Sequence, residues 1–377
     1  MTISGMLANP LITPNLTDVV AEFGQLDSKA SLLVAVVPLP GILLALLIGL
    51  MADRYGRRRV VVLCLALFGT AGLASAIAPT FEILLLSRFI QGFGSAGLLN
   101  LSIVLIADHW SGEQRTTIMG RNSAALAIGL VAVPPVSGLL ASLTSWRWSL
   151  AIATIAIPLA LMAYKTLPSQ AIGGWRSTSG YLEGLKASLR SPVVLATLIT
   201  GFALFAVIFG VFTTALPIHL ANEFELGSGV RGAVLATPAI TSVAASLYLG
   251  KISKAASTKK IIFIAGALIS CSAFAIGATS TLWVVIAASL VYGLGDGVLI
   301  PTLQSIVATS VPSEKRASVL ALWTSFVRLG QLTGPLVAGL LIHVVNTGTV
   351  MIVGAVGFGL VSLFWLKTTL DLSFVSK

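Results

Sequence analysis

The sequence predicts an all-α membrane protein that crosses the bilayer many times and consists of two six-helix bundles. Its composition is 56% hydrophobic and only 10% charged, with a mean hydropathy of +0.99, whereas soluble domains carry about 25% charged residues. Uncharged runs of membrane-spanning length follow one another along the chain. The second half repeats the pattern of the first at a constant offset of 201 residues. This combination excludes a soluble globular fold.

The apolar runs define twelve expected transmembrane helices. In the first half they cover residues 1–20, 30–52, 60–79, 82–107, 117–141 and 149–167. In the second half they cover 193–217, 230–250, 261–280, 282–309, 317–342 and 349–367. Each is judged by its length and its lack of charge. We therefore expect an N-terminal bundle at 1–167, a cytoplasmic linker at 168–192 and a C-terminal bundle at 193–377.

The basic residues indicate membrane topology rather than nucleic-acid binding. The formal net charge is +10, but Lys and Arg lie in short connections between apolar runs. Of the 23 Lys and Arg residues, 18 fall on one side of the predicted layout and three, Lys29, Arg147 and Arg231, on the other. Because Lys and Arg concentrate in cytoplasmic loops, this bias places both termini in the cytoplasm. The expected location is the plasma membrane.

The internal repeat aligns motifs of the two halves without gaps. With a shift of 201 residues, Glu22, Gly49, Gly92, Gly94, Gly129, Pro134 and Gly138 fall on Glu223, Gly250, Gly293, Gly295, Gly330, Pro335 and Gly339. This predicts a duplicated six-helix unit in parallel orientation, with substrate sites near the middle of the membrane between the halves. By the same shift, the first helix is truncated at its cytoplasmic end. Either the start codon is misassigned, which we favour, or the protein tolerates a short first helix.

A short cationic turn separates the second and third expected helices. It contains Gly49, Asp53, Arg54, Gly56, Arg57 and Arg58. Gly49 allows close helix packing and Gly56 allows the turn. Asp53 can accept charge-assisted hydrogen bonds from Arg57 or from the other half, which predicts a latch for a cytoplasmic gate. The alternative is a topology signal alone. In the second half Lys254 replaces the aspartate, so the latch is asymmetric; Asp108 is a further candidate member.

These residues resemble the major facilitator superfamily of secondary transporters. The turn matches the family's motif between the second and third helices. Arg88, Gln91, Gly92 and Gly94 match the fourth-helix motif of its drug/proton antiporter branch. Gly129, Pro134 and Gly138 resemble the fifth-helix antiporter motif of that branch, which is degraded here, since Val133 stands where glycine is expected. The resemblance implies the family's two-bundle fold and a latch that holds the outward-facing state, and it leaves the direction of transport open.

Three charged residues lie well inside the expected helices, away from their ends: Arg88, Asp296 and Arg328. A charge there is costly unless it is paired or faces water, so each is a functional candidate. Asp296 and Arg328 lie at matching depths on consecutive helices, about 21 Å from the outer ends by helical rise, and could form an ion pair. Such a pair either couples protonation of Asp296 to transport or is static. Arg88, with Gln91 one turn on, either binds an anionic substrate group or regulates proton movement.

The leading prediction is a proton-coupled secondary transporter that exports small organic or amphiphilic molecules by alternating access. The alternatives are an uptake permease for a small anion or metabolite, and a transporter-like membrane sensor that does not itself transport. The sequence contains no nucleotide-binding loop, metal-ligand cluster or catalytic constellation, so we expect neither enzymatic activity nor a metal or cofactor. The expected partners are a small-molecule substrate, protons and the lipid bilayer, and a monomer is expected.

Overall fold

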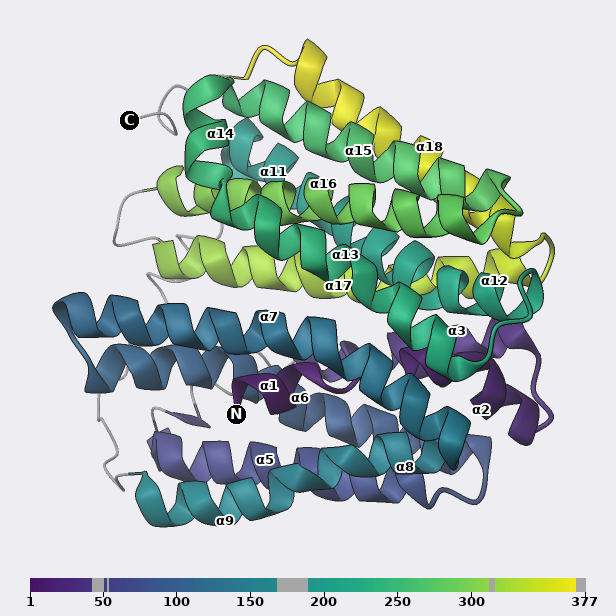
Figure 1. Ribbon diagram of the computed structural model, residues 1–377. Helices are drawn as coiled ribbons and strands as arrows, with labels where there is room; N and C mark the ends of the chain where they lie inside the picture. Colours follow the sequence, from purple (N-terminus) through teal and green to yellow (C-terminus); the bar gives the residue numbers. More distant parts are fainter. Residues whose placement is uncertain (43–50, 53, 168–188, 312–315, 371–377) are drawn as a thin grey trace. The chain divides into compact units, whose positions relative to one another are not determined.

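The computed structural model describes residues 1–42, 51–52, 54–167, 189–311 and 316–370. Within these ranges the chain is helical and contains no β-strand. Ten of the described helices are long and apolar enough to cross a membrane. The prediction of an all-α polytopic membrane protein is therefore confirmed. Figure 1 shows long helices joined by short connections.

The described residues form two compact units. Unit 1 consists of Met1–Trp175 and Glu225–Ala236, and unit 2 of Arg176–Phe224 and Thr237–Lys377. The predicted domain limits at 167 and 193 are not tested by this grouping and stay a prediction. Helix α13, Ser228–Leu247, contributes residues to both units. Its first turns belong to unit 1 although they lie in the second half of the sequence.

The helices of unit 1 cover most of the first half of the chain. They are α1 (Thr2–Met6), η1 (Thr13–Asn15), α2 (Leu16–Glu22), η2 (Asp27–Lys29), α3 (Ala30–Ala35), α5 (Arg57–Ala76), α6 (Phe81–His109), α7 (Gly112–Leu143), α8 (Trp146–Ala151), η3 (Ile152–Ile155) and α9 (Ala156–Thr166). Helix α5 packs along α6 and also contacts α8 and α9.

The helices of unit 2 repeat this arrangement. They are α11 (Pro192–Val207), the π-helical η4 (Ile208–Ala215), α12 (Leu216–Asn222), α14 (Leu249–Ala255), α15 (Thr258–Ala278), α16 (Leu282–Thr309), α17 (Arg316–Ile342) and α18 (Thr347–Lys367). Helices α15, α16 and α18 begin 201 residues after α5, α6 and α8. Helix α15 packs along α16 and α18, and α11 along α17.

The first expected helix is not continuous, which corrects the predicted span at 1–20. Helix α1 ends at Met6, and turns lead through Ile12 to η1 and α2. Pro10 and Pro14 lie in this region, and proline lacks the N–H that an uninterrupted helix needs. The corresponding part of the second half is η4, where the helix widens to π geometry. Both repeats therefore depart from the regular α-helix at the same place.

Glycines set the closest helix contacts in each unit. A Cβ on Gly94 of α6 would lie 2.5 Å from the Cys64 carbonyl oxygen of α5, and a Cβ on Gly295 of α16 would lie 2.5 Å from the Ala265 carbonyl oxygen of α15. Only glycine fits at either place, because a side chain would overlap the backbone of the neighbouring helix. The two positions are 201 residues apart, so the repeat preserves the packing as well as the lengths of the helices.

Candidate transport site

Arg88 is the centre of a polar cluster inside unit 1. Its side chain is 0% exposed on α6. Nε and Nη2 donate to the Leu33 carbonyl oxygen at 3.4 and 3.3 Å. Nη1 donates to the Ala8 carbonyl oxygen at 2.8 Å and to Gln91 Oε1 at 2.7 Å, and Nη2 also donates to Asn9 Oδ1 at 2.9 Å. A guanidinium has five N–H donors, and all five are used.

The acceptors around Arg88 explain why it is buried here. The second predicted span, at 30–52, is also interrupted, because α3 ends at Ala35 and turns follow it. Ala8 lies in the break of the first span and Leu33 in the last turn before the break of the second, and helix breaks leave carbonyl groups without their usual partners. Arg88 donates to both of them. No described carboxylate lies within ion-pair distance of the guanidinium, so its positive charge is solvated by neutral oxygens alone. Since every donor is used, this arrangement leaves none for an anionic substrate.

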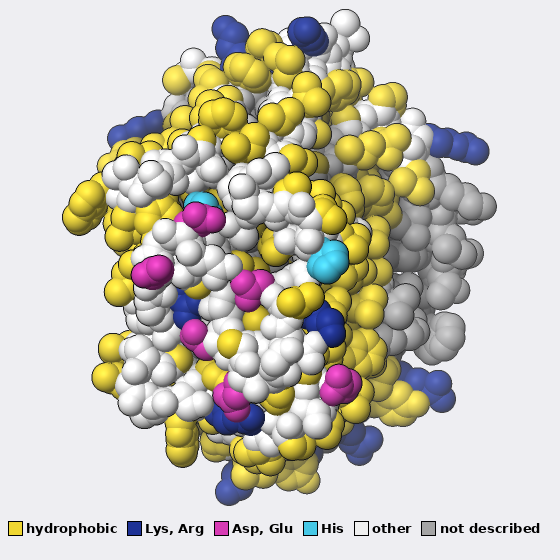
Figure 2. All heavy atoms as spheres, turned by 90° about the vertical axis from the view of Figure 1, so that its right-hand side faces the viewer, with side chains coloured by type: hydrophobic (Ala, Val, Ile, Leu, Met, Phe, Trp, Pro, Cys, Tyr) yellow, Lys and Arg dark blue, Asp and Glu magenta, His cyan; other side chains and the backbone are white. Residues whose placement is uncertain are grey.

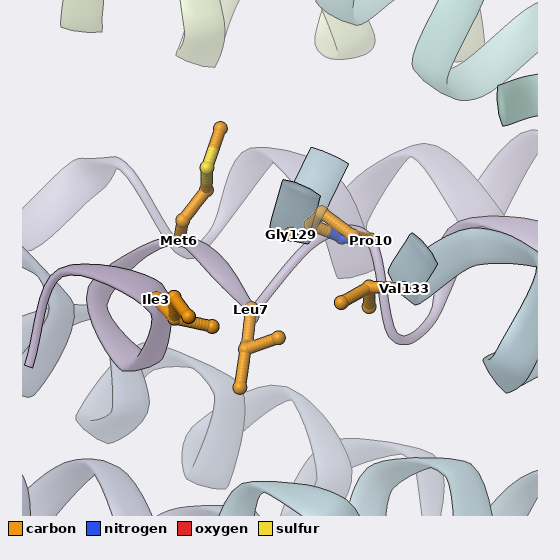
Figure 3. A pocket seen from close by; sticks show the side chains of 6 residues that line it. All are labelled: Ile3, Met6, Leu7, Pro10, Gly129 and Val133. Atoms are coloured by element: carbon orange, nitrogen blue, oxygen red, sulfur yellow. The ribbon is translucent and has the colours of Figure 1, made fainter. Parts of the chain in front are cut away.

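A small apolar pocket lies between the broken segment and α7. Figure 3 shows the side chains that line it, from the first helix, the turn that follows and α7. They are Ile3, Met6, Leu7, Pro10, Gly129 and Val133. Two of these residues, Gly129 and Val133, belong to the fifth-helix motif found in the sequence. This motif therefore faces the irregular part of the first predicted span.

The remainder of the same motif packs against the first turns of α13 within unit 1. A Cβ on Gly138 would lie 2.2 Å from the Ser228 carbonyl oxygen, and one on Gly232 would lie 2.4 Å from the Pro134 carbonyl oxygen. The Ser228 hydroxyl also donates to the Gly138 carbonyl oxygen at 3.2 Å. These contacts bring the two helix backbones together directly, which requires glycine on each side.

Asp296 is the centre of a second cluster, in unit 2. It is partly buried on α16, and its Oδ2 accepts a hydrogen bond of 3.2 Å from the Ser242 hydroxyl of α13. Its Oδ1 is buried without a hydrogen-bond partner. One turn earlier, Tyr292 stacks on Phe212 of η4, with ring centroids 3.6 Å apart. Sequence reasoning found Asp296 but missed Ser242 and the aromatic pair, which no motif marks.

Arg328 does not form the ion pair that its depth suggested. It is 8% exposed on α17, and no ion pair joins it to Asp296. Its Nε has no hydrogen-bond partner among the described residues. Matching depth on consecutive helices does not fix the direction in which each side chain points, and this is why the predicted pair is absent. Asp296 and Arg328 are therefore two separate charges within unit 2.

The cationic turn is described only in part, since Gly49 and Asp53 lie outside the described residues. Gly56 has a positive φ of 89°, a conformation that glycine adopts readily. Arg57 forms an ion pair with Asp108 at the end of α6. Arg58 lies over the ring of Tyr164, 4.7 Å from its centroid. The exposed Arg54 lies over the neighbouring Tyr55 ring.

Two ion pairs at α2 were not predicted. Glu22 accepts hydrogen bonds from Arg147 Nη2 at 2.8 Å and from Trp146 Nε1 at 2.5 Å. One turn earlier Asp18 accepts from Arg231 Nη2 at 2.5 Å, and Arg231 Nη1 donates to the Thr17 hydroxyl. Helix α2 lies at the right-hand side of Figure 1, and Figure 2 shows that side facing the viewer. Acidic and basic side chains occur together on it.

Comparison with known proteins gives one family for the whole chain. The model of the Major Facilitator Superfamily matches residues 1–231 and 198–373. The Bacillibactin exporter of Bacillus subtilis (strain 168) is 24% identical, over 97% of this chain and 93% of that protein. The 3-(3-hydroxy-phenyl)propionate transporter of Escherichia coli (strain K12) is 27% identical, over 84% and 77%. A solved D-xylose-proton symporter has a TM-score of 0.76 at 18% identity, covering 100% of this chain and 97% of that one.

Proposed function

The chain belongs to the Major Facilitator Superfamily and is a multi-pass membrane transporter, and from this premise we propose that it is a proton-coupled exporter of small organic or amphiphilic molecules. It works by alternating access, in which two bundles expose a substrate site to each side of the membrane in turn. Its substrate site is exposed to the cytoplasm in one state and to the outside in the other. The name of one full-length relative, an exporter, supports this direction.

One observation carries the proposal of proton coupling: Asp296 lies in a membrane helix without a cationic partner among the described residues. A carboxylate inside a membrane helix is costly when it is ionised and has no cationic partner. Asp296 has only the Ser242 hydroxyl, and its second oxygen has no hydrogen bond. Protonation removes the uncompensated charge, so this group can take up and release a proton during the cycle. Arg328, which forms no ion pair with it, does not hold it in the ionised state.

The cationic turn serves as the gate latch in this proposal. Arg57 and Asp108 supply the described ion pair at the end of α6, and Gly49, Asp53, Arg54, Gly56 and Arg58 complete the motif. An ion pair that forms in one state of the cycle and breaks in the other biases the equilibrium between them. The protein lies in the plasma membrane as a monomer with both termini in the cytoplasm.

The experiment measures proton release that depends on substrate. Purified protein is first screened against a panel of small organic compounds by thermal shift, because a ligand that binds the native state stabilises it. A compound that binds is added to proteoliposomes containing a pH-sensitive dye. Wild-type protein is expected to move protons when the compound is added, and Asp296→Asn is expected to bind the compound without moving protons.

The matched control is Glu82→Gln, which also replaces an acid by its amide. Glu82 is exposed in the first turn of α6, so this variant should couple as the wild type does. Undiminished proton movement in Asp296→Asn would remove Asp296 from the mechanism.

The second candidate function is uptake of a small anion or metabolite. The observation that favours it is Arg328, whose Nε has no hydrogen-bond partner among the described residues. A guanidinium with an unused donor suits a carboxylate or phosphate. Accumulation of a labelled anion by intact cells, lost in Arg328→Gln, would favour this function over export.

A further inference from the structure

The amide of Asn9 has a fixed orientation, and Arg88 is the reason. Guanidinium nitrogens carry only donors, so the atom of the amide that meets Arg88 Nη2 at 2.9 Å must be the acceptor, Oδ1. Nδ2 then points away from Arg88. Arg88 itself cannot turn, because its other four N–H groups are held by Leu33, Ala8 and Gln91.

The Nδ2 group of Asn9 has two N–H donors and no partner. No described residue accepts a hydrogen bond from it, and it is not among the buried unsatisfied atoms. Asn9 is half-buried in the turns that break the first predicted helix. Irregular backbone at membrane depth is tolerated where it is enclosed by protein or lines a water-filled cavity, and broken helices form substrate sites in transporters.

The surroundings of this amide define the chemistry of a ligand. Arg88 places a positive charge behind Asn9 with no described carboxylate to balance it, so the local potential favours an oxygen that carries negative charge. The amide therefore suits a ligand oxygen that accepts hydrogen bonds and carries negative charge.

We propose that Asn9 is a substrate-recognition residue that donates hydrogen bonds from Nδ2 to a carboxylate or similar oxygen of an amphiphilic substrate. Arg88 is the positioning residue that orients the amide and does not itself touch the substrate. This inference rests on the proposed transport function and adds a substrate class and a contact to it. It assigns recognition to unit 1, whereas proton coupling was assigned to Asp296 in unit 2.

The experiment compares two probes with the same apolar part, 3-phenylpropionate and 3-phenylpropylamine. Their dissociation constants are measured by thermal-shift titration of purified full-length protein without a proton gradient. Wild-type protein is expected to prefer the carboxylate. Asn9→Asp keeps an acceptor for Arg88 but replaces the donor by a negative charge, so the carboxylate should bind at least about 10-fold more weakly. The amine should bind no more weakly than before, and the preference should reverse.

Two further variants separate contact from structural damage. Arg88→Lys keeps the charge but cannot supply the fork that fixes the amide, so the preference should shrink without reversing. Asn346→Asp is the matched control, because Asn346 is exposed and uses only its acceptor oxygen, towards the Thr349 N–H. It should leave both affinities unchanged.

Four results would overturn the inference. They are equal binding of the two probes by the wild type, no shift with 3-phenylpropionate, an unchanged preference in Asn9→Asp, and equal weakening of both probes in that variant. The proposed function fails separately: a protein that shows the reversal but no substrate-dependent proton movement is not a proton-coupled exporter. If the wild type moves protons with substrate but Asn9→Asp still prefers the carboxylate probe, only the role of Asn9 is refuted.

Discussion

The ion pair between Arg231 and Asp18 should contribute measurably to the stability of unit 1. The Arg231 side chain is 2% exposed, whereas that of Asp18 is 44% exposed. Exposed ion pairs contribute about 0–1 kcal/mol, and hydrogen bonds to charged groups about 1.5–3 kcal/mol. Because one partner is buried and the other is half in solvent, we expect a coupling of about 1–2 kcal/mol, between these ranges.

A double-mutant cycle measures that coupling. The free energy of unfolding is determined by denaturant titration in detergent for the wild type, Arg231→Gln, Asp18→Asn and the double variant. The control cycle uses Lys29 and Gln25, whose side chains form an exposed hydrogen bond of 2.5 Å and should couple by less than about 0.5 kcal/mol. A coupling between Arg231 and Asp18 as small as that of the control pair would refute the reasoning from burial.

Two further predictions concern packing and buried hydrogen bonds. Gly94→Ala should lower the free energy of unfolding by about 1–3 kcal/mol, because its Cβ would lie 2.5 and 2.7 Å from backbone atoms of α5. The control is Gly120→Ala, whose Cβ would have no atom within 4 Å. It should be neutral or stabilising in the same titration. Thr200→Val should cost about 1–3 kcal/mol, because it leaves the buried indole N–H of Trp365 without its acceptor at 2.8 Å. Thr197→Val removes only a bond to its own helix backbone and should cost less; equal losses would contradict the assignment.

The helices could be predicted from the sequence because length and apolarity are local properties. The expected span at 282–309 agrees with α16 in full, and the one at 349–367 lies within α18. The same criterion failed for the first span, which was expected to be one helix but is interrupted by turns around Pro10. Hydropathy measures whether a segment can be buried in lipid and carries no information on where its backbone hydrogen bonding breaks.

The partners of buried charges could not be predicted, because they depend on tertiary structure. For Arg88 the sequence suggested either an anionic ligand or a role in proton movement, since its own expected helix offers no acid except Glu82, six residues earlier. The structure supplies two backbone carbonyls from broken helices, and carbonyl groups have no signature in a sequence. Arg231 was counted only as a topology marker, although Asp18 at the same predicted level was a signal that the two could meet.

The repeat shows how one scaffold acquires two different polar sites. Gly94 of α6 and its counterpart in α16 keep the same helix contact, but the polar positions nearby have diverged. Arg88 corresponds to Ser289, and Ser95 corresponds to Asp296, at the constant offset of 201 residues. Positions seven residues apart share a helix face, so each helix presents one charge on that face, positive in α6 and negative in α16. The two charges therefore have different surroundings: Arg88 donates to the Ala8 carbonyl of the interrupted first span in unit 1, and Asp296 accepts from Ser242 in unit 2, where we propose that it carries the proton.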